Sequence, residues 1–190
     1  MKSLGKLVAV LGSTGSGKSV LIEHIRNLYP EINAPVSYTT RAMRPGEVDG
    51  KHYHFVSKEE FEHRVAQGDF IEWVEFAGNY YGSRKSDIFP HIEAGELVLD
   101  EFDLDGIRAY KKILPPGQFV SIFIDGGSWE ELEHRVRARA PIAENELEKR
   151  KKRYEDELSF KPEATYIIQN PEGKLNEAKK QFEDIINSLT

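Results

Sequence analysis

The hydrophobic residues of this chain form short runs that alternate with longer segments of helical periodicity. Lys6–Leu11 is an apolar run followed by glycine, which is typical of a buried strand. Lys18–Leu28 has apolar residues at helical spacing and Pro30 just beyond it, so we expect a helix there. Similar patterns predict strands at Phe70–Phe76, Glu96–Phe102, Phe119–Ile124 and Thr165–Ile168. They predict helices at Lys58–Gln67, Ile88–Ala94, Asp105–Ile113, Trp129–Arg139, Glu144–Leu158 and Leu175–Leu189.

This alternation predicts an α/β protein with a largely parallel sheet. The 190 residues suit one domain, because no repeat or linker divides them. Ser57 with Glu60 and Ser128 with Glu131 predict capping boxes at two helix starts. The irregular segment 35–57 carries arginines, hydroxyls and a tyrosine, so we expect it to be functional.

Composition excludes several classes of protein. The chain has no cysteine, which rules out disulfides, thiolate zinc sites and a cysteine nucleophile. Its apolar runs are far shorter than the ~20 residues that span a bilayer, and no signal-peptide core follows Met1, so we expect a soluble cytoplasmic protein. The net charge of -6 argues against binding a nucleic acid polymer over the whole surface, but it permits a small cationic pocket.

The strongest motif follows the first predicted strand. Residues 12–19 fit the phosphate-binding pattern G-x-x-x-x-G-K-[ST], with a strand before and a helix after. Glycines let backbone amides cradle phosphate, Lys18 reaches the β- and γ-phosphates, and Ser19 offers its hydroxyl to Mg²⁺. This predicts a nucleoside triphosphate site but leaves GTPase, ATPase and small-kinase activities open. The residues expected there are Gly12, Ser13, Thr14, Gly15, Ser16, Gly17, Lys18, Ser19 and Val20.

The chain between this loop and Asn170 resembles the guanylate kinase family. The most specific matches are Val36–Arg41, Arg44–Glu47, Asp49–Tyr53, Phe70–Trp73 and Gly78–Ser83. The resemblance implies a P-loop NTPase-type three-layer core (about 1–35, 85–127 and 160–190), an inserted GMP-binding subdomain (about 36–84) and a helical lid (about 128–159). It also implies Mg²⁺-dependent transfer of the γ-phosphoryl group of ATP to GMP, and to dGMP, as a monomer or homodimer.

A nucleoside monophosphate needs cationic forks and hydroxyl donors for its phosphate dianion. Arg41 and Arg44 suit that need, and the family resemblance assigns them to the GMP phosphate. Glu72 is expected to read guanine, because one carboxylate accepts from both N1–H and the amino group, a pair that adenine lacks. The remaining residues expected at this site are Ser37, Tyr53, Tyr81, Ser83, Glu101 and Asp103.

The resemblance also implies roles for acidic residues and for the lid. Glu101 is expected near the water shell of Mg²⁺ and Asp103 near the monophosphate. Either Asp103 or Asp105 can instead cap the next helix, and for Asp105 capping is the preferred role. Lid arginines would neutralise the transferring group, since phosphoryl transfer needs water excluded. The residues expected to be catalytic are Lys18, Arg41, Arg139 and Arg150, and Arg135, Arg139 and Asn170 are expected at ATP.

Several alternatives stay open. Arg41 and Arg44 can be solvated loop residues, and Glu72 can point outward from its strand. The basic run 149–153 favours an ion-paired helix face over nucleic acid binding, and His52 with His54 favours packing or exposure over a metal site. Departures from the family pattern are Gly12-Ser13-Thr14, Val20 and Ala140-Pro141. The rival functions are a peptide-binding module without catalysis and a kinase for another phosphorylated acceptor.

Overall fold

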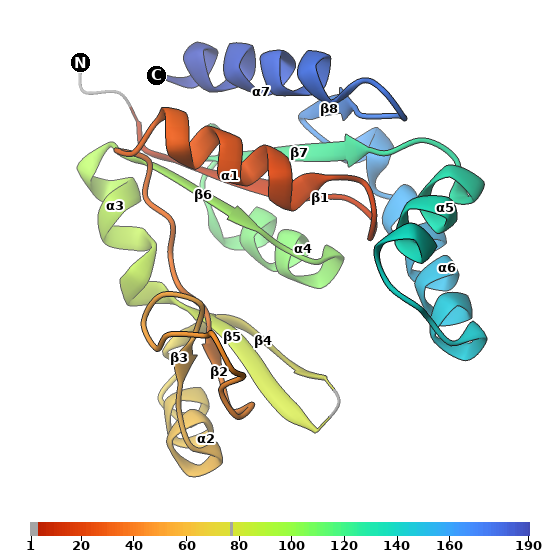
Figure 1. Cartoon of the computed structure of the whole chain (residues 1–190). Helices are drawn as coiled ribbons and strands as arrows, with labels where there is room; N and C mark the ends of the chain where they lie inside the picture. Colours follow the sequence, from red (N-terminus) through yellow and green to blue (C-terminus); the bar gives the residue numbers. More distant parts are fainter. Residues whose placement is uncertain (1–3, 77) are drawn as a thin grey trace.

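The computed structural model describes residues 4–76 and 78–190. Its main sheet has four parallel strands in the order β6-β1-β7-β8 (Figure 1). The strands are β1 (Lys6–Leu11), β6 (Leu97–Glu101), β7 (Phe119–Asp125) and β8 (Tyr166–Gln169). The two central strands, β1 and β7, are buried along nearly their whole length, and their sequences are accordingly almost continuously apolar. The predicted α/β class with a parallel sheet is confirmed.

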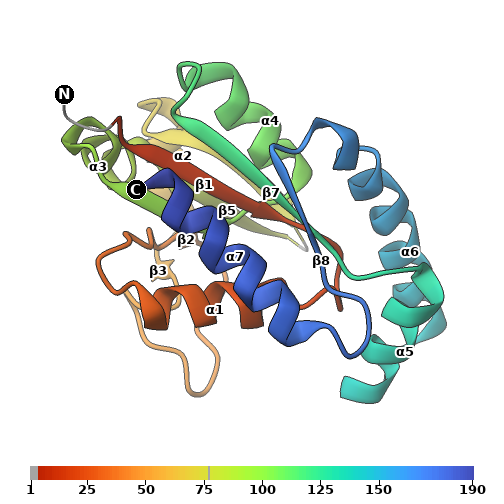
Figure 2. The same ribbon diagram turned by 90° about the horizontal axis from the view of Figure 1, so that it is seen from above.

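Helices cover both faces of this sheet (Figure 2). Val8 and Val10 of β1 belong to the core formed with α1 (Lys18–Leu28) and α7 (Leu175–Leu189). Leu7 and Ala9, which alternate with them, belong to the core formed with α3 (Phe89–Ala94) and α4 (Leu104–Ile113). The result is a three-layer core, as predicted.

A second, mixed sheet with strand order β3-β2-β5-β4 lies below the main sheet in Figure 1. Its strands are β2 (Tyr38–Thr39), β3 (His54–Phe55), β4 (Phe70–Phe76) and β5 (Asn79–Arg84). Helix α2 (Lys58–Ala66) packs on it through Phe61, which is fully buried and stacks on the ring of Phe70 at a centroid distance of 4.4 Å. This unit therefore has a small core of its own.

Two helices, α5 (Trp129–Arg139) and α6 (Glu144–Leu158), stand beside the carboxyl edge of the main sheet (Figure 1). They pack on each other through a separate cluster that contains Trp129, Val136 and Leu147. Short 3-10 turns, Lys85–Asp87 and Lys161–Glu163, follow β5 and α6. Within the described ranges, none of the helices combines the length and apolar character needed to cross a bilayer.

The helix starts correct two predictions. Ser128 and Glu131 form the complete capping box. At α2, the Ser57 hydroxyl accepts from the Glu60 N–H, but the Glu60 carboxylate accepts from Arg64 and not from the Ser57 backbone, so the box is incomplete. Asp105 does not cap α4. Asp103 does, since its Oδ1 accepts from the Gly106 N–H at 2.8 Å, and Asp105 lies inside the first turn.

Candidate active site

The phosphate-binding loop joins the carboxyl end of β1 to the first turn of α1. Gly15 and Gly17 have φ angles of 87° and 90°, the left-handed region that favours glycine. Gly17 is also the N-cap of α1, and a Cβ atom there would collide with the Asn170 side chain. The glycines thus give the loop the curvature that its motif predicts, and Ser19 and Val20 follow on the exposed first turn of α1.

Asn170 stabilises the phosphate-binding loop by a hydrogen bond to its backbone. It is buried, and its Nδ2 donates to the backbone oxygen of Ser16 at 2.7 Å. Arg135 reaches the same place from α5, where its Nη1 donates to the oxygens of Gly15 at 3.2 Å and Asn170 at 3.1 Å. Both residues were predicted at ATP, and both contact the backbone of the loop in the structure.

Lys18 ends at the carboxyl edge of the sheet. Its Nζ lies 3.3 Å from Oε1 of Glu101, the last residue of β6, because β1 and β6 are parallel neighbours that end at one edge. No group of three or more His, Cys, Asp or Glu residues in the described ranges is arranged to hold a metal by itself. Ser19 and Glu101 suit Mg²⁺ instead, because this ion is bound through one or two protein ligands together with water and phosphate oxygens.

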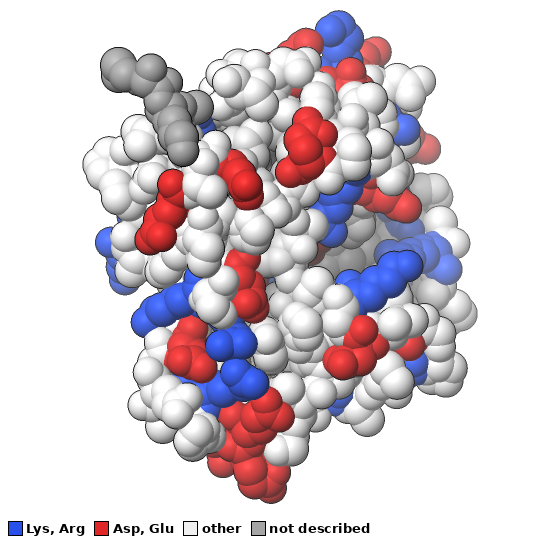
Figure 3. Space-filling model, turned by 90° about the vertical axis from the view of Figure 1, so that its left-hand side faces the viewer, with Lys and Arg blue, Asp and Glu red and all other residues white. Residues whose placement is uncertain are grey.

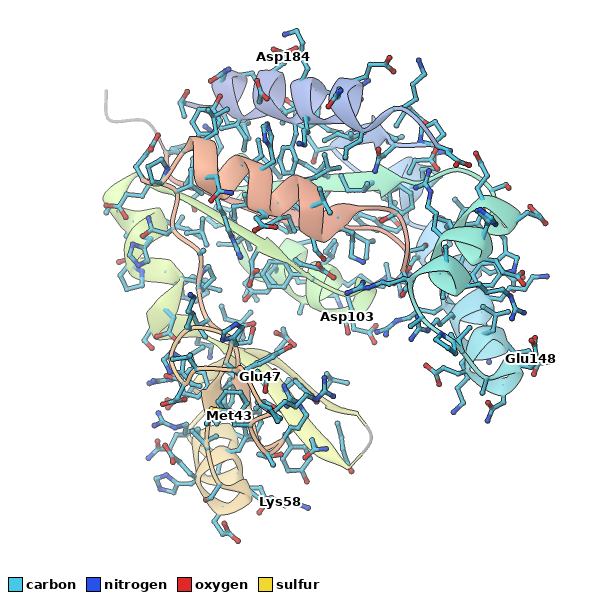
Figure 4. The ribbon with its side chains drawn as sticks, viewed as in Figure 1. Met43, Glu47, Lys58, Asp103, Glu148 and Asp184 are labelled. Atoms are coloured by element: carbon cyan, nitrogen blue, oxygen red, sulfur yellow. The ribbon has the colours of Figure 1, made fainter. Side chains whose placement is uncertain are left out.

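A cavity of about 380 Å³ lies between the main sheet, the small sheet and α6. Its lining brings together residues predicted for both substrates, namely Gly12, Thr14, Lys18, Ser37, Tyr53, Glu72, Tyr81, Ser83, Glu101 and Asp103. Asp103 lies between the two sheets in Figure 4. Figure 3 shows that one face of the molecule is hollowed, with Lys and Arg at the edge of the hollow. Residues far apart in the sequence thus share one space.

Glu72 faces this cavity rather than solvent. It pairs with Ser83 across the β4–β5 ladder, and Ser83 Oγ lies 3.5 Å from Ser37 Oγ. Burial raises the pKa of Glu72 to about 7, the negative charge of Asp103 adds to this rise, and the Ser83 hydroxyl opposes it. A carboxyl group in such a place exchanges its proton near neutral pH and gains from a ligand with N–H donors.

Arg41 and Arg44 are not in the cavity lining of the described residues. Arg41 lies behind Tyr53, with its guanidinium carbon 5.6 Å from that ring centroid, and its side chain is paired with Glu47. That pairing raises the pKa of Arg41, and the Tyr81 hydroxyl contributes to the rise. Arg44 is exposed in the loop between β2 and β3. Arg41 is therefore linked to the cavity through two tyrosines that line it.

A second cavity, of about 240 Å³, lies between the phosphate-binding loop and the two helices α5 and α6. Arg135, Arg139 and Arg150 line it together with Thr14 and Gly15. Thr14 also lines the first cavity, so the two spaces adjoin at the loop. Three arginines predicted for the triphosphate therefore meet beside the loop that is predicted to bind it.

Sequence reasoning missed two cavity residues of α6. Glu157 is a buried carboxylate; burial raises its pKa, and Ser13 and Lys18 oppose the rise. Arg153 lies 3.6 Å from Glu157 and 3.7 Å from Asp103. The spacing of Arg153 and Glu157, four residues apart on a predicted helix, was the available signal. The basic run does form ion pairs along α6, as expected, while Glu148 projects outward (Figure 4).

The two histidines of the irregular segment have local roles. His52 Nδ1 accepts from the Val48 N–H at 3.0 Å, and the His54 ring stacks on Tyr38 at 4.5 Å between centroids. His52 is exposed and His54 is packed, which matches the predicted exposure or packing.

Comparisons with known proteins agree over nearly the whole chain. The model of the family "Guanylate kinase" matches residues 4–189. A guanylate kinase of Synechococcus sp. (strain CC9311) is 41% identical over 182 residues, which are 95% of each chain. One of Trichormus variabilis is 41% identical over 168 residues, 88% of this chain and 83% of that one. The crystal structure of guanylate kinase from Anaplasma phagocytophilum has a TM-score of 0.74 at 29% identity, covering 98% of this chain and 87% of that one. The chain belongs to the guanylate kinase family, the P-loop kinases that convert ATP and GMP into ADP and GDP.

Proposed function

We propose that the 380 Å³ cavity binds GMP and that the adjoining 240 Å³ cavity receives the triphosphate of ATP. The observation that carries this proposal is the meeting of Glu72 and Ser83 with Lys18 in one lining. Glu72 accepts from guanine N1–H and the amino group, while Ser83 contacts the base. Arg41, Arg44, Tyr53 and Tyr81 hold the phosphate of GMP, whereas Ser37, whose Oγ lies 3.5 Å from Ser83 Oγ, lies at the base end of the cavity. Because these roles involve base and phosphate and spare the ribose, dGMP is expected to serve as well.

The chain's residues then catalyse transfer by alignment and charge stabilisation. A phosphate oxygen of GMP attacks the γ-phosphorus of ATP in line, the bond to the β–γ bridging oxygen breaks, and ADP leaves. Lys18, Arg139 and Arg150 stabilise the charge on the transferring group, and Arg41 fixes the acceptor phosphate. Mg²⁺, held by the Ser19 hydroxyl and through water by Glu101, would neutralise charge on the triphosphate when bound.

We further propose three functional parts, with the core at about 1–35, 85–127 and 160–190. The GMP-binding part spans about 36–84, and α5 and α6 form the lid at about 128–159. The lid closes over the core when both nucleotides are bound, because transfer to GMP rather than to water requires a dry site.

An acceptor panel tests the proposal. ADP release from ATP is measured with GMP, dGMP, AMP, UMP and CMP as acceptors, each with and without Mg²⁺. We expect strong preference for GMP and dGMP, and dependence on the metal. Preference for AMP would show that Glu72 does not read the base, and ATP hydrolysis without acceptor transfer would overturn the assignment of the lid.

A further inference from the structure

Glu47 is in neither described cavity lining, yet it contacts both arginines assigned to the acceptor phosphate. Its Oε1 accepts from Nη2 of Arg41 at 2.8 Å, and its Oε2 accepts from Nη1 of Arg41 at 3.0 Å. The same Oε2 accepts from the backbone N–H of Arg44 at 2.7 Å. One carboxylate therefore joins the side chain of the first arginine to the backbone of the second.

A carboxylate beside an anion-binding arginine needs an explanation, because its charge opposes that of the incoming phosphate. A guanidinium has five N–H donors in a planar fork. Glu47 and the Ala42 carbonyl, at 2.8 Å, occupy three of them. The Nε–H and one N–H of Nη2 form the adjacent edge of the same plane, which suits two phosphate oxygens. The Tyr81 hydroxyl, a further phosphate donor of the proposed site, also interacts with this guanidinium.

The rings around Arg41 restrict the guanidinium further. The centroids of Tyr53 and Phe55 each lie 5.6 Å from its central carbon, so aromatic groups flank it. The side chains of Arg41 and Glu47 are only 13% and 18% exposed. Hydrogen bonds from Arg41 and from the Arg44 backbone lower the pKa of Glu47 to about 2, so the carboxylate is ionised throughout the neutral range.

We propose that Glu47 is a positioning residue for the acceptor: it holds Arg41 by one edge, so that the adjacent edge is ready for the phosphate of GMP. Binding then does not have to freeze a free arginine side chain, which is a cost that preorganisation avoids. This inference rests on the assignment of Arg41 to the GMP phosphate in the proposed function. It adds a residue that acts through Arg41 and does not touch the substrate.

The variant Glu47→Gln tests this, because it keeps the size of the side chain but replaces one acceptor oxygen by an amide donor. Asp49→Asn is the matched control, since Asp49 lies in the same segment and its Oδ1 accepts from the Phe55 N–H at 2.8 Å without contacting Arg41. Steady-state KM for GMP and for ATP, kcat, and inhibition by guanosine, which has no phosphate, are measured for each. Arg41→Ala and the double variant complete a cycle.

We expect Glu47→Gln to raise KM for GMP about tenfold, as supporting residues of preorganised sites do. KM for ATP and the inhibition constant of guanosine should keep their wild-type values, as should all constants of Asp49→Asn. In the Arg41→Ala background, Glu47→Gln should cause no further loss.

Three results would overturn the inference. The first is an unchanged KM for GMP in Glu47→Gln. The second is a parallel weakening of inhibition by guanosine, which would indicate that the whole segment is disturbed. The third is a rise in KM for GMP in the double variant that equals the sum of the effects of the two single variants. Should Arg41→Ala itself bind GMP normally, the assignment of Arg41 in the proposed function fails as well. Failure of Glu47→Gln alone leaves that assignment intact, so the two ideas are tested separately.

Discussion

Replacing Glu72 by Gln should weaken the recognition of GMP and stabilise the nucleotide-free protein. Glu72 lies in the cavity wall opposite Ser83, and no ion pair neutralises it among the described residues. The Gln side chain has the same shape but one acceptor oxygen instead of two. Its amide group would face one of the two N–H donors of guanine, which leaves both groups without a partner.

The pKa of Glu72 sets the change in stability, and the usual strength of a hydrogen bond to a charged group sets the change in recognition. A pKa of about 7 instead of 4.5 means that the charged form of Glu72 costs the nucleotide-free fold about 3 kcal/mol. Because the pKa is raised in the folded protein, Glu72 lowers the free energy of unfolding only when it is charged. This cost is absent below the unfolded pKa of 4.5, grows as the pH rises, and is complete above about pH 7. At about pH 8 Gln therefore recovers up to about 3 kcal/mol. Losing one hydrogen bond to a charged group costs GMP about 1.5–3 kcal/mol, or roughly tenfold to a hundredfold in kcat/KM.

The assay compares kcat/KM for GMP with the free energy of unfolding, measured in urea on the nucleotide-free protein. Glu75→Gln is the control, because Glu75 is exposed on the same strand, outside the cavity lining. We expect Glu72→Gln to be slower with GMP and more stable, and Glu75→Gln to resemble the wild type. A Glu72→Gln protein that is less stable, or that uses GMP as well as the wild type, would refute the reasoning.

Three further predictions follow from the same geometry. The wild-type kcat/KM for GMP should fall as pH drops below about 7, because Glu72 takes up a proton there, and a pH–rate profile of Glu72→Gln should lack this ionisation. Lys18→Ala should abolish nearly all turnover in the coupled ADP assay with an unchanged circular dichroism spectrum; wild-type rates would contradict its role. Asn170→Ala leaves the buried Ser16 carbonyl without its 2.7 Å donor, so urea unfolding should show a loss of about 2 kcal/mol, together with a raised KM for ATP and an unchanged KM for GMP. A raised KM for GMP alone would show that Asn170 does not act through the loop.

The periodic parts of the fold are predictable because burial dictates them locally. The bounds of β1, α1, α5, α6 and α7 coincide with the predicted ranges. Strand β5 is different, because Asn-Tyr-Tyr-Gly-Ser-Arg has no apolar alternation and becomes a strand by pairing with β4 and β2. Strands β2 and β3 have two residues each, which is too short for any periodicity. Long-range pairing defines these elements.

The site divides in the same way. The phosphate-binding loop is local, so its motif predicts both residues and geometry. Asp103 and Asp105 carry equal local signals for an N-cap, and the choice depends on where α4 begins beneath the cavity. The four-residue spacing of Arg153 and Glu157 predicts their ion pair, but they reach the cavity only because α6 lies beside the start of α4 and the loop, which depends on tertiary packing. The partner of Arg41 likewise depends on how the irregular segment turns.

The charged side chains that line the 380 Å³ cavity distinguish its two ends. Its described lining has four carboxylates, Glu72, Glu101, Asp103 and Glu157, and only two cations, Lys18 and Arg153, which is an unexpected balance for an anion site. Lys18 pairs with Glu101, and Arg153 lies between Asp103 and Glu157, so Glu72 alone of the four lacks an ion-pair partner among these described residues. A carboxylate without a cation repels phosphate and favours a neutral ring edge with two N–H donors. This balance supports the proposed placement of guanine at Glu72, with the phosphate toward Lys18 and the Tyr53–Arg41 side, which is the orientation that phosphoryl transfer from the loop requires.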